Sequence, residues 1–410
     1  MKKAGLTRSL TDERRWPGST SRRGGPRQSG DTCHLARGFG PFRTPMSDAS
    51  PDTPDSTPPV AAARPRLVYP FAAKPAPGAR LEVAPGVHWL RMPLPFHLDH
   101  INLWTLQEEG GYAVVDTGTR SEDVIAHWQA HFEATKDEGQ PTRVIVTHMH
   151  PDHVGTAGWI ARRFEVPLWM TRLEYMSCRV MVGDTGREPP PDAIAFYRRA
   201  GWSRHAIDVY RGRFGRFGLY IHALPESYRR LHDGQLLRIG GRDWRVVVGS
   251  GHSPEHACLY CAEDGLFISG DQVLPRISSN VSVHPVEPEA DPLSDWLASL
   301  QKLRREVADD VLVLPAHNEP FRGLHARLDA LASGQEIALT RLRRRLAEPR
   351  RAIDVFAALF GRPVPEGDVS LLGLATGESV ACLNHLLYRG ELEVEVDAAG
   401  VCWYRMKAAG

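Results

Sequence analysis

The sequence has few cysteines for its length. Six cysteines are scattered over 410 residues, which is unlike the dense spacing of a secreted disulfide framework. Cys258 and Cys261 form a C-x-x-C pair inside the strand-like run "ACLYCAE". Residues three apart on a strand face opposite sides, so we expect structural cysteines and not a redox or zinc pair. A cytoplasmic location is the prediction.

Long apolar runs and an excess of one charge are also missing. No stretch approaches the ~20 apolar residues of a membrane-spanning helix, and the amino-terminal region lacks the apolar centre of a signal peptide. Fifty basic and 49 acidic residues give a net charge of +1. The chain as a whole is therefore not drawn to nucleic acid or to a membrane surface.

The first part of the chain has little to bury. Residues 1–64 are rich in Arg, Ser, Pro and Gly, and we expect them to be disordered. An Arg-rich transit peptide is disfavoured by Asp12, Glu13 and Asp31. Met46 is an alternative start to Met1, so the sequence leaves the true beginning open.

Residues 65–325 predict a layered α/β domain. Short apolar strands alternate with helices such as "SEDVIAHWQAHFEAT", which Ser121 caps. The run "TRVIVTH" predicts a strand buried on both faces. Residues 172–230 interrupt this rhythm with a mostly helical insertion, which is typical of a lid or a substrate wall.

Residues 326–410 differ in pattern. One long helix is expected from "ARLDALASGQEIALTRLRRRLAE", and two more from "AIDVFAALFG" and "ESVACLNHLLYRGE". Two strands about an Ala-Gly turn follow in "LEVEVDAAGVCWYRM". Three helices and a two-stranded wing predict a winged-helix domain.

Four potential metal ligands crowd the loop after the buried strand. In "THMHPDHVG", the residues His148, His150, Asp152 and His153 occupy six positions. A lone histidine is most often a satisfied core or surface residue, but this density favours a cation site at the carboxyl end of a strand.

Three later segments end apolar strands with the same residue types. They supply His252 after "RVVVGSG", Asp271 after "LFISG" and His317 after "VLVLPA". Five imidazoles and two carboxylates suffice for two adjacent metals with open positions for water. Mixed nitrogen and oxygen ligation favours zinc, with iron or manganese as alternatives.

This ordered set of residues resembles the metallo-β-lactamase fold superfamily of dinuclear hydrolases. The resemblance implies a four-layer αββα sandwich with the site at one edge of its two sheets. It also implies that His148, His150 and His252 hold the first metal, that Asp152, His153 and His317 hold the second, and that Asp271 bridges them. Asp116 in "VVDTGT" matches an aspartate that orients a ligand. We therefore expect hydrolysis by a metal-bridging hydroxide, with Asp152, His153 and Asp116 as the catalytic residues.

The motifs indicate less about the roles of the other histidines and of Tyr175. His256 fits a loop-supporting position better than a ligand position. Tyr175 and His284 are candidates to face substrate, and so are His97 and His100. A packing role is at least as common for each of these types.

With the predicted winged-helix domain of residues 326–410 after the last metal histidine, the chain resembles the lactamase-β-2-like group, and its catalytic domain resembles glyoxalase II. Relatives of this kind cleave thioesters, open lactones or cut single-stranded RNA. We rank a thioester, ester or lactone of a small molecule first and a single-strand-specific endoribonuclease or phosphodiesterase second. DNA reading by a transcription factor comes third. The nuclease alternative rests on a basic cluster of Arg341, Arg343, Arg344, Arg345, Arg350 and Arg351. The oligomeric state is not predicted.

Overall fold

Two β-sheets form the centre of the described chain. The computed structural model describes residues 67–95 and 98–408, so the expected disorder of residues 1–64, and His97, lie outside the described residues. The first sheet has the order β1 (Arg80–Ala84), β2 (Val87–Pro93), β3 (His100–Glu108), β4 (Gly111–Val115), β5 (Gln140–Ile145), β6 (Leu168–Met170) and β7 (Arg229–Arg230). The second has the order β12 (Leu312–Pro315), β11 (Leu266–Gly270), β10 (His256–Cys261), β9 (Arg242–Gly249) and β8 (Leu236–Ile239).

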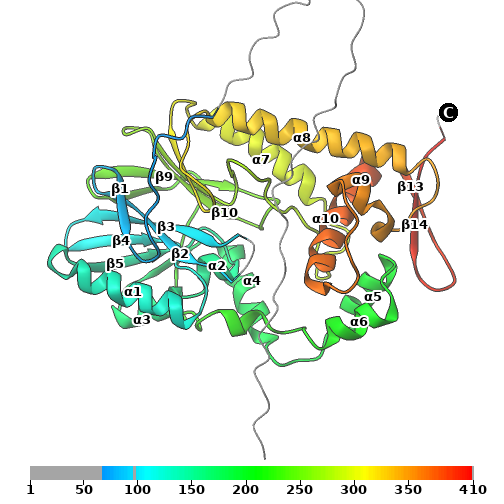
Figure 1. The fold of residues 1–410 in the computed structure, drawn as a ribbon, viewed down its shortest axis with the longest axis horizontal. Helices are drawn as coiled ribbons and strands as arrows, with labels where there is room; N and C mark the ends of the chain where they lie inside the picture. The colour runs from blue at the N-terminus through cyan, green and yellow to red at the C-terminus, as the bar shows by residue number, and fades with distance from the viewer. Residues whose placement is uncertain (1–66, 96–97, 409–410) are drawn as a thin grey trace, which may run out of the picture. The chain divides into compact units, whose positions relative to one another are not determined.

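Helices cover the outer face of each sheet (Figure 1). Helices α1 (Glu122–Ala134) and α3 (Ala157–Arg163) pack on the first sheet, and α7 (Pro292–Glu306) and α8 (Leu324–Arg345) on the second. A third apolar cluster, which includes Trp89, Trp104 and Trp244, fills the space between the sheets. Three cores therefore separate four layers in the order αββα.

Local sequence features explain several of these elements. The Ser121 side chain accepts a hydrogen bond from the backbone N–H of Val124 at 3.2 Å, which confirms the predicted cap of α1. Strand β10 carries Cys258 into the core under α7 and α8, and Cys261 into the core between the sheets. The two cysteines thus face opposite sides of the strand, as predicted, and both are free.

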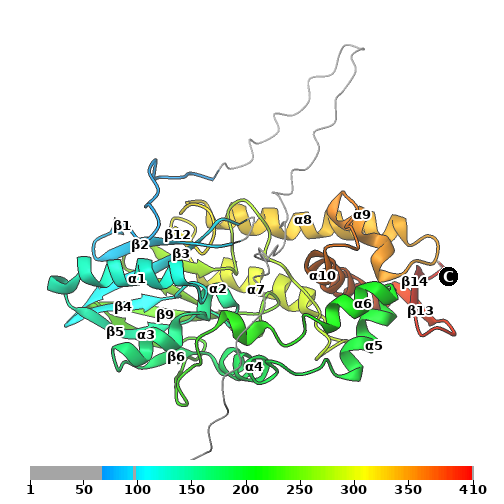
Figure 2. The same cartoon turned by 60° about the horizontal axis from the view of Figure 1, so that its bottom comes forward.

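The insertion is helical, as the sequence predicts. It contains α4 (Arg172–Gly183), α5 (Pro191–Arg199), α6 (Arg204–Arg211) and the 3-10 helix η2 (Phe217–Tyr220). Figure 2 shows α6 beside α10 (Val369–Tyr388) of the carboxyl-terminal part. There, Trp202 Nε1 donates a hydrogen bond to Thr376 Oγ1 at 2.9 Å, and both side chains are buried.

The carboxyl-terminal part has the predicted order of three helical segments and a hairpin. After α8 come the 3-10 helix η3 (Ala352–Val355), α9 (Phe356–Phe360), α10 and the antiparallel pair β13 (Leu392–Val396) and β14 (Cys402–Met406). Helix α10 begins at Val369, well before the predicted start, because the Asp368 side chain caps it by accepting from Leu371 N. Among the described helices, none combines the length and apolar character needed to cross a membrane.

Candidate metal centre

The loop that follows β5 forms one wall of a polar cluster. Thr147 and His148 leave the strand, and the short helix α2 (Pro151–Val154) begins directly after His150. His148 and His153 are fully buried. Pro151 occupies the first helical position, for which its fixed φ is suited, and α2 carries Asp152 and His153.

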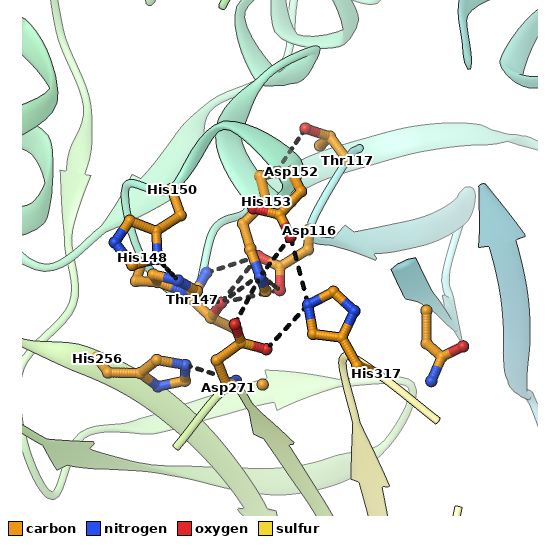
Figure 3. Close-up of polar contacts among 12 residues, drawn as sticks. Asp116, Thr117, Thr147, His148, His150, Asp152, His153, His256, Asp271 and His317 are labelled. Carbon is orange, nitrogen blue, oxygen red and sulfur yellow. Dashed lines mark hydrogen bonds and ion pairs between the residues drawn. The ribbon is translucent and has the colours of Figure 1, made fainter. Parts of the chain in front are cut away.

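Strand ends of the second sheet complete the cluster (Figure 3). His252 lies in the loop between β9 and β10, Asp271 directly follows β11, and His317 lies two residues past β12. The seven predicted ligands form two groups, and within each group the potential ligand atoms lie within 4.8 Å of one another. The groups are His148, His150, His252 and Asp271, and Asp152, His153 and His317.

The first group is built around His148. Its Nε2 lies 2.8 Å from His150 Nδ1 and 3.2 Å from His252 Nε2. His252 Nε2 also lies 3.5 Å from Asp271 Oδ2. Three imidazole nitrogens and one carboxylate oxygen therefore converge on one point, which is a ligand set suited to a divalent cation.

The second group shares Asp271 with the first. His317 Nε2 lies 3.3 Å from Asp152 Oδ2 and 3.5 Å from Asp271 Oδ1. His153 Nε2 lies 3.7 Å from Asp152 Oδ2 and 3.6 Å from Asp271 Oδ2. Asp271 thus faces imidazoles of both groups.

Hydrogen bonds to the outer ring nitrogens fix three of these imidazoles. His252 Nδ1 donates to the Asn280 carbonyl at 2.7 Å. His317 Nδ1 donates to the His100 carbonyl at 2.9 Å. In His153, Nδ1 lies 2.8 Å from Asp116 Oδ2. Each bond occupies the outer ring nitrogen and directs Nε2 into the cluster, which is how metal-binding histidines are usually oriented.

Asp116 orients the loop as well as one ring. Its backbone has a φ of 60°, a conformation rarely adopted by non-glycine residues. The side chain accepts from the Thr147 backbone N–H at 2.8 Å and from the Thr147 hydroxyl. Asp116 therefore holds His153 and the start of the ligand loop together from behind the cluster, and it is a positioning residue.

The charges of the cluster divide into two zones. Burial, reinforced by the neighbouring imidazoles, lowers the pKa of His148 well below its ordinary value. Burial also lowers the pKa of His317, but the carboxylates of Asp271 and Asp152 outweigh it and raise that pKa to about 10. The carboxylates of Asp271 and Asp152 therefore favour positive charge on the His317 side of the cluster.

Two atoms directed into the cluster have no hydrogen-bond partner in the described chain. They are His153 Nε2 and Asp271 Oδ1, and both are buried. Leaving a buried polar atom without a partner costs about 1–3 kcal/mol. A cation between the groups would satisfy both atoms, so the residues present fit divalent metal ions.

Two of the weaker candidates support the ligands. His256 is buried, and its Nε2 accepts from the Asp271 backbone N–H at 3.1 Å. His100 Nε2 accepts from Asn318 N at 3.0 Å, next to His317. The structure therefore assigns His100 to the support of the His317 loop and not to substrate.

The two expected substrate residues differ in position. Tyr175 is buried, stacks on Tyr228 at 3.9 Å, and donates to the Pro225 carbonyl at 2.8 Å. These contacts give Tyr175 a packing role, and its predicted contact with substrate stays a prediction. His284 lines a pocket beside α10.

Two supporting carboxyl groups were missed by the sequence reading. Glu174 of α4 is fully buried and accepts from Met149 N at 2.9 Å and from Glu255 N at 2.8 Å, which ties the two ligand loops together. Glu378 of α10 accepts from Asn280 Nδ2 at 3.1 Å. Desolvation raises the pKa of Glu378 to about 7, against the effect of the Asn280 hydrogen bond. Neither residue belongs to a motif, so only the fold reveals it.

Replacement of Glu378 by alanine is expected to weaken metal binding by roughly 10-fold. Asn280 would lose the acceptor of its side-chain amide N–H and keep only the Ser282 hydroxyl as a side-chain partner, and its carbonyl holds the ring of His252. Metal affinity should be measured by competition with a chromogenic chelator. Glu378→Gln, which keeps an acceptor oxygen, should restore most of the affinity, and exposed Glu366→Ala should have no effect. Wild-type affinity in Glu378→Ala would refute this chain of contacts.

The fold and the site agree with the sequence family. The chain matches the Metallo-beta-lactamase superfamily over residues 98–317 and the Metallo-beta-lactamase-like, C-terminal domain over residues 339–407. It therefore belongs to the metallo-beta-lactamase superfamily, which confirms the resemblance at that level.

Two solved structures resemble this chain over most of its length. A beta-lactamase domain protein from Burkholderia ambifaria is 42% identical, with a TM-score of 0.76 over 83% of this chain and 98% of that one. A metallo-beta-lactamase family protein from Thermus thermophilus is 25% identical, with a TM-score of 0.65 over 80% of this chain and all of that one.

Curated relatives include proteins named as thioesterases. The atrochrysone carboxyl ACP thioesterase dmxR1 of a Cryptosporiopsis species is 31% identical over 58% of this chain and 54% of its own length. The probable metallo-hydrolase YflN of Bacillus subtilis is 28% identical over 48% of this chain and 67% of its own length. The chain thus spans only about half of the thioesterase that it matches here.

Proposed function

We propose that the protein is a dinuclear metal-dependent hydrolase of a thioester, ester or lactone of a small molecule. The observation that carries the proposal is the position of Asp271, whose carboxylate faces His252 of one group and His153 and His317 of the other. A carboxylate shared by two ligand groups is the arrangement that a two-metal site needs. Zinc is the proposed metal, with iron or manganese as alternatives.

Each residue of the cluster has a role in this proposal. His148, His150 and His252 would hold one cation, Asp152, His153 and His317 the other, and Asp271 both. When bound, the cations supply a water of lowered pKa and polarise the carbonyl oxygen of the substrate. Asp116, His100 and Asn280 keep the ligand rings directed inward, so that little reorganisation is needed during the reaction.

The names of curated relatives support a thioester within this range. Two matched proteins are named atrochrysone carboxyl ACP thioesterases, at 31% and 34% identity. The second alignment covers only 27% of this chain and 24% of its protein. The proposal therefore remains at the level of an activated carbonyl ester.

The arginine cluster on which the nuclease alternative rests is largely engaged within the domain. Five of its six members are held by neighbours: Arg341 by the Leu359 carbonyl, Arg343 by Glu336 and Glu391, Arg345 by the Asp354 carbonyl, Arg350 by Glu348, and Arg351 by Asp354. Guanidiniums paired in this way are less available to phosphates. This observation ranks the nuclease second.

The lactamase-β-2-like assignment, the winged-helix character of residues 326–410 and the cytoplasmic location also remain proposals. Three helical segments and a hairpin support the second. The five free, buried cysteines of the described chain support a reducing compartment.

Hydrolysis assays on metal-loaded protein test the proposed function. The panel contains an acyl thioester, a p-nitrophenyl ester, an acyl lactone, a phosphodiester and a single-stranded RNA. We expect turnover of at least one of the carbonyl esters. Cleavage of RNA or phosphodiester alone would replace the first proposal by the second.

Neutralisation of the basic cluster separates the same two functions. Arg344 and Arg345 are exposed and Arg350 is half-buried, and replacement of all three by glutamine should change kcat/KM for a carbonyl ester by less than about twofold, as is usual for changes away from a site. The measurement is kcat/KM at several salt concentrations. If the triple variant loses activity and its salt dependence becomes flatter, the cluster contacts a phosphate backbone.

A further inference from the structure

A pocket of about 410 Å³ lies between the insertion and the carboxyl-terminal part. Three segments line it: residues 197–220 of the insertion, residues 282–284, and the first half of α10. Its volume falls within the range of about 300–1,000 Å³ that is usual for small-molecule sites.

Two arginines give this pocket a positive charge. Arg213 and Arg216 line it and are half-buried. Neither guanidinium forms an ion pair or a side-chain hydrogen bond with any described residue, and no acidic side chain of the described chain lines the pocket. Half-buried guanidiniums without a carboxylate are suited to bind an anionic group of a ligand.

The neighbouring wall is aromatic and rigid. The rings of Tyr197 and Trp202 lie 4.1 Å apart, and those of Tyr197 and Tyr210 lie 4.6 Å apart. The indole of Trp202 is fixed by its hydrogen bond to Thr376. Such a wall offers apolar aromatic ring surface beside the two charges.

One loop joins this pocket to the metal centre. Asn280 holds the ring of His252, and Ser282 and Val283, two and three residues later, line the pocket. Val283 N donates to the Gly377 carbonyl at 3.0 Å, which fixes the loop against α10. The loop that lines the pocket is therefore also the loop that holds His252 at the metal centre.

We propose that this pocket binds the substrate by an anionic group and a flat apolar group, with Arg213 and Arg216 contacting the anion. The inference rests on the proposed function and names the substrate class of that site. The substrate is then an activated carbonyl ester whose body is aromatic or similarly flat and which carries a carboxylate, sulfonate or phosphate.

Binding of a matched pair of probes tests the pocket without any turnover. The pair is naphthalene-2-sulfonate and the uncharged 2-(methylsulfonyl)naphthalene, titrated by calorimetry into metal-loaded protein. The Arg213→Gln/Arg216→Gln variant should weaken sulfonate binding about 10-fold or more and leave the sulfone unchanged. Exposed Arg211→Gln is the matched control and should bind both probes like the wild type.

A second variant fills the pocket itself. A Cβ added at Gly373 meets nothing within 4 Å, and Gly373 lines the pocket, so Gly373→Phe adds a ring at the pocket wall. It should weaken binding of both probes. No saturable binding to the wild type, or unchanged sulfonate binding in both variants, would overturn the inference.

Turnover separates this inference from the proposed function. On an anionic and a neutral ester of the same acyl group, the double arginine variant should raise KM for the anionic ester about 10-fold and leave kcat unchanged. If the double arginine variant leaves the ratio of the two KM values as it is in the wild type, the pocket is overturned and the hydrolase stays intact. Binding as described without hydrolysis of any ester would overturn the hydrolase and leave the pocket intact.

Discussion

Replacement of Asp152 by alanine is expected to lower kcat/KM by more than about 100-fold. Loss of an outer partner of a metal ligand typically costs 10–100-fold, and Asp152 supplies a donor atom of its own. Its carboxylate lies 3.3 Å from His317 Nε2 and 3.7 Å from His153 Nε2, and it is the one acidic member of its group. Without it, two imidazoles remain to hold the second cation with the help of Asp271.

The controls for this prediction separate charge from folding. Asp152→Asn keeps the size of the side chain and should lose most of the activity, because a neutral amide binds a cation less well. Exposed Asp137→Ala, on the same domain, should retain wild-type kcat/KM. The melting temperature of each variant should be recorded beside the rates. Full activity in Asp152→Ala would contradict the two-metal mechanism for any substrate.

Removal of the metal is expected to abolish hydrolysis and to lower the melting temperature by several degrees. The stability of a protein rises by about 2.7 kcal/mol when a ligand that binds only the folded state is present at 100 times its Kd. Each 1 kcal/mol corresponds to roughly 2–4 °C for a domain of about 150–250 residues and to somewhat less for a longer chain. The measurement is activity and thermal unfolding after dialysis against a chelator, followed by titration with zinc.

Iron and manganese serve as the alternatives in that titration. Recovery of both rate and melting temperature with one of the three ions identifies a competent metal. Chelator-treated protein that keeps its rate and its melting temperature would show that the cluster works without a cation.

The ligand set and the layered fold were accessible from the sequence because both depend on local pattern. Each proposed ligand follows an apolar strand, and strand ends of a layered α/β fold converge on one edge. His148 and His317 are 169 residues apart in the chain but lie in adjacent groups of the same cluster. The density of histidine and aspartate in one loop was the decisive signal.

Other features depend on contacts between distant segments and could not be predicted. Tyr175 was a candidate to face substrate, but the ring that stacks on it, Tyr228, lies 53 residues later in the chain. The contact between Asn280 and Glu378 spans 98 residues.

The pairing of the arginines in the basic cluster also could not be predicted from the sequence. Sequence composition marked the arginines but not their partners. Arg343 is paired with Glu391, 48 residues away, and only the folded tail reveals that this charge is neutralised. The number of arginines in a segment therefore says less about nucleic acid than the number that remain unpaired.

Metal stoichiometry tests the central claim most directly. Elemental analysis of gently purified wild-type protein, beside Asp152→Ala, counts the cations held by the two groups that share Asp271. The two-metal account predicts close to two equivalents of divalent metal per chain in the wild type and close to one in the variant. No bound metal in the wild type, with no uptake of zinc, manganese or iron on addition, would contradict it.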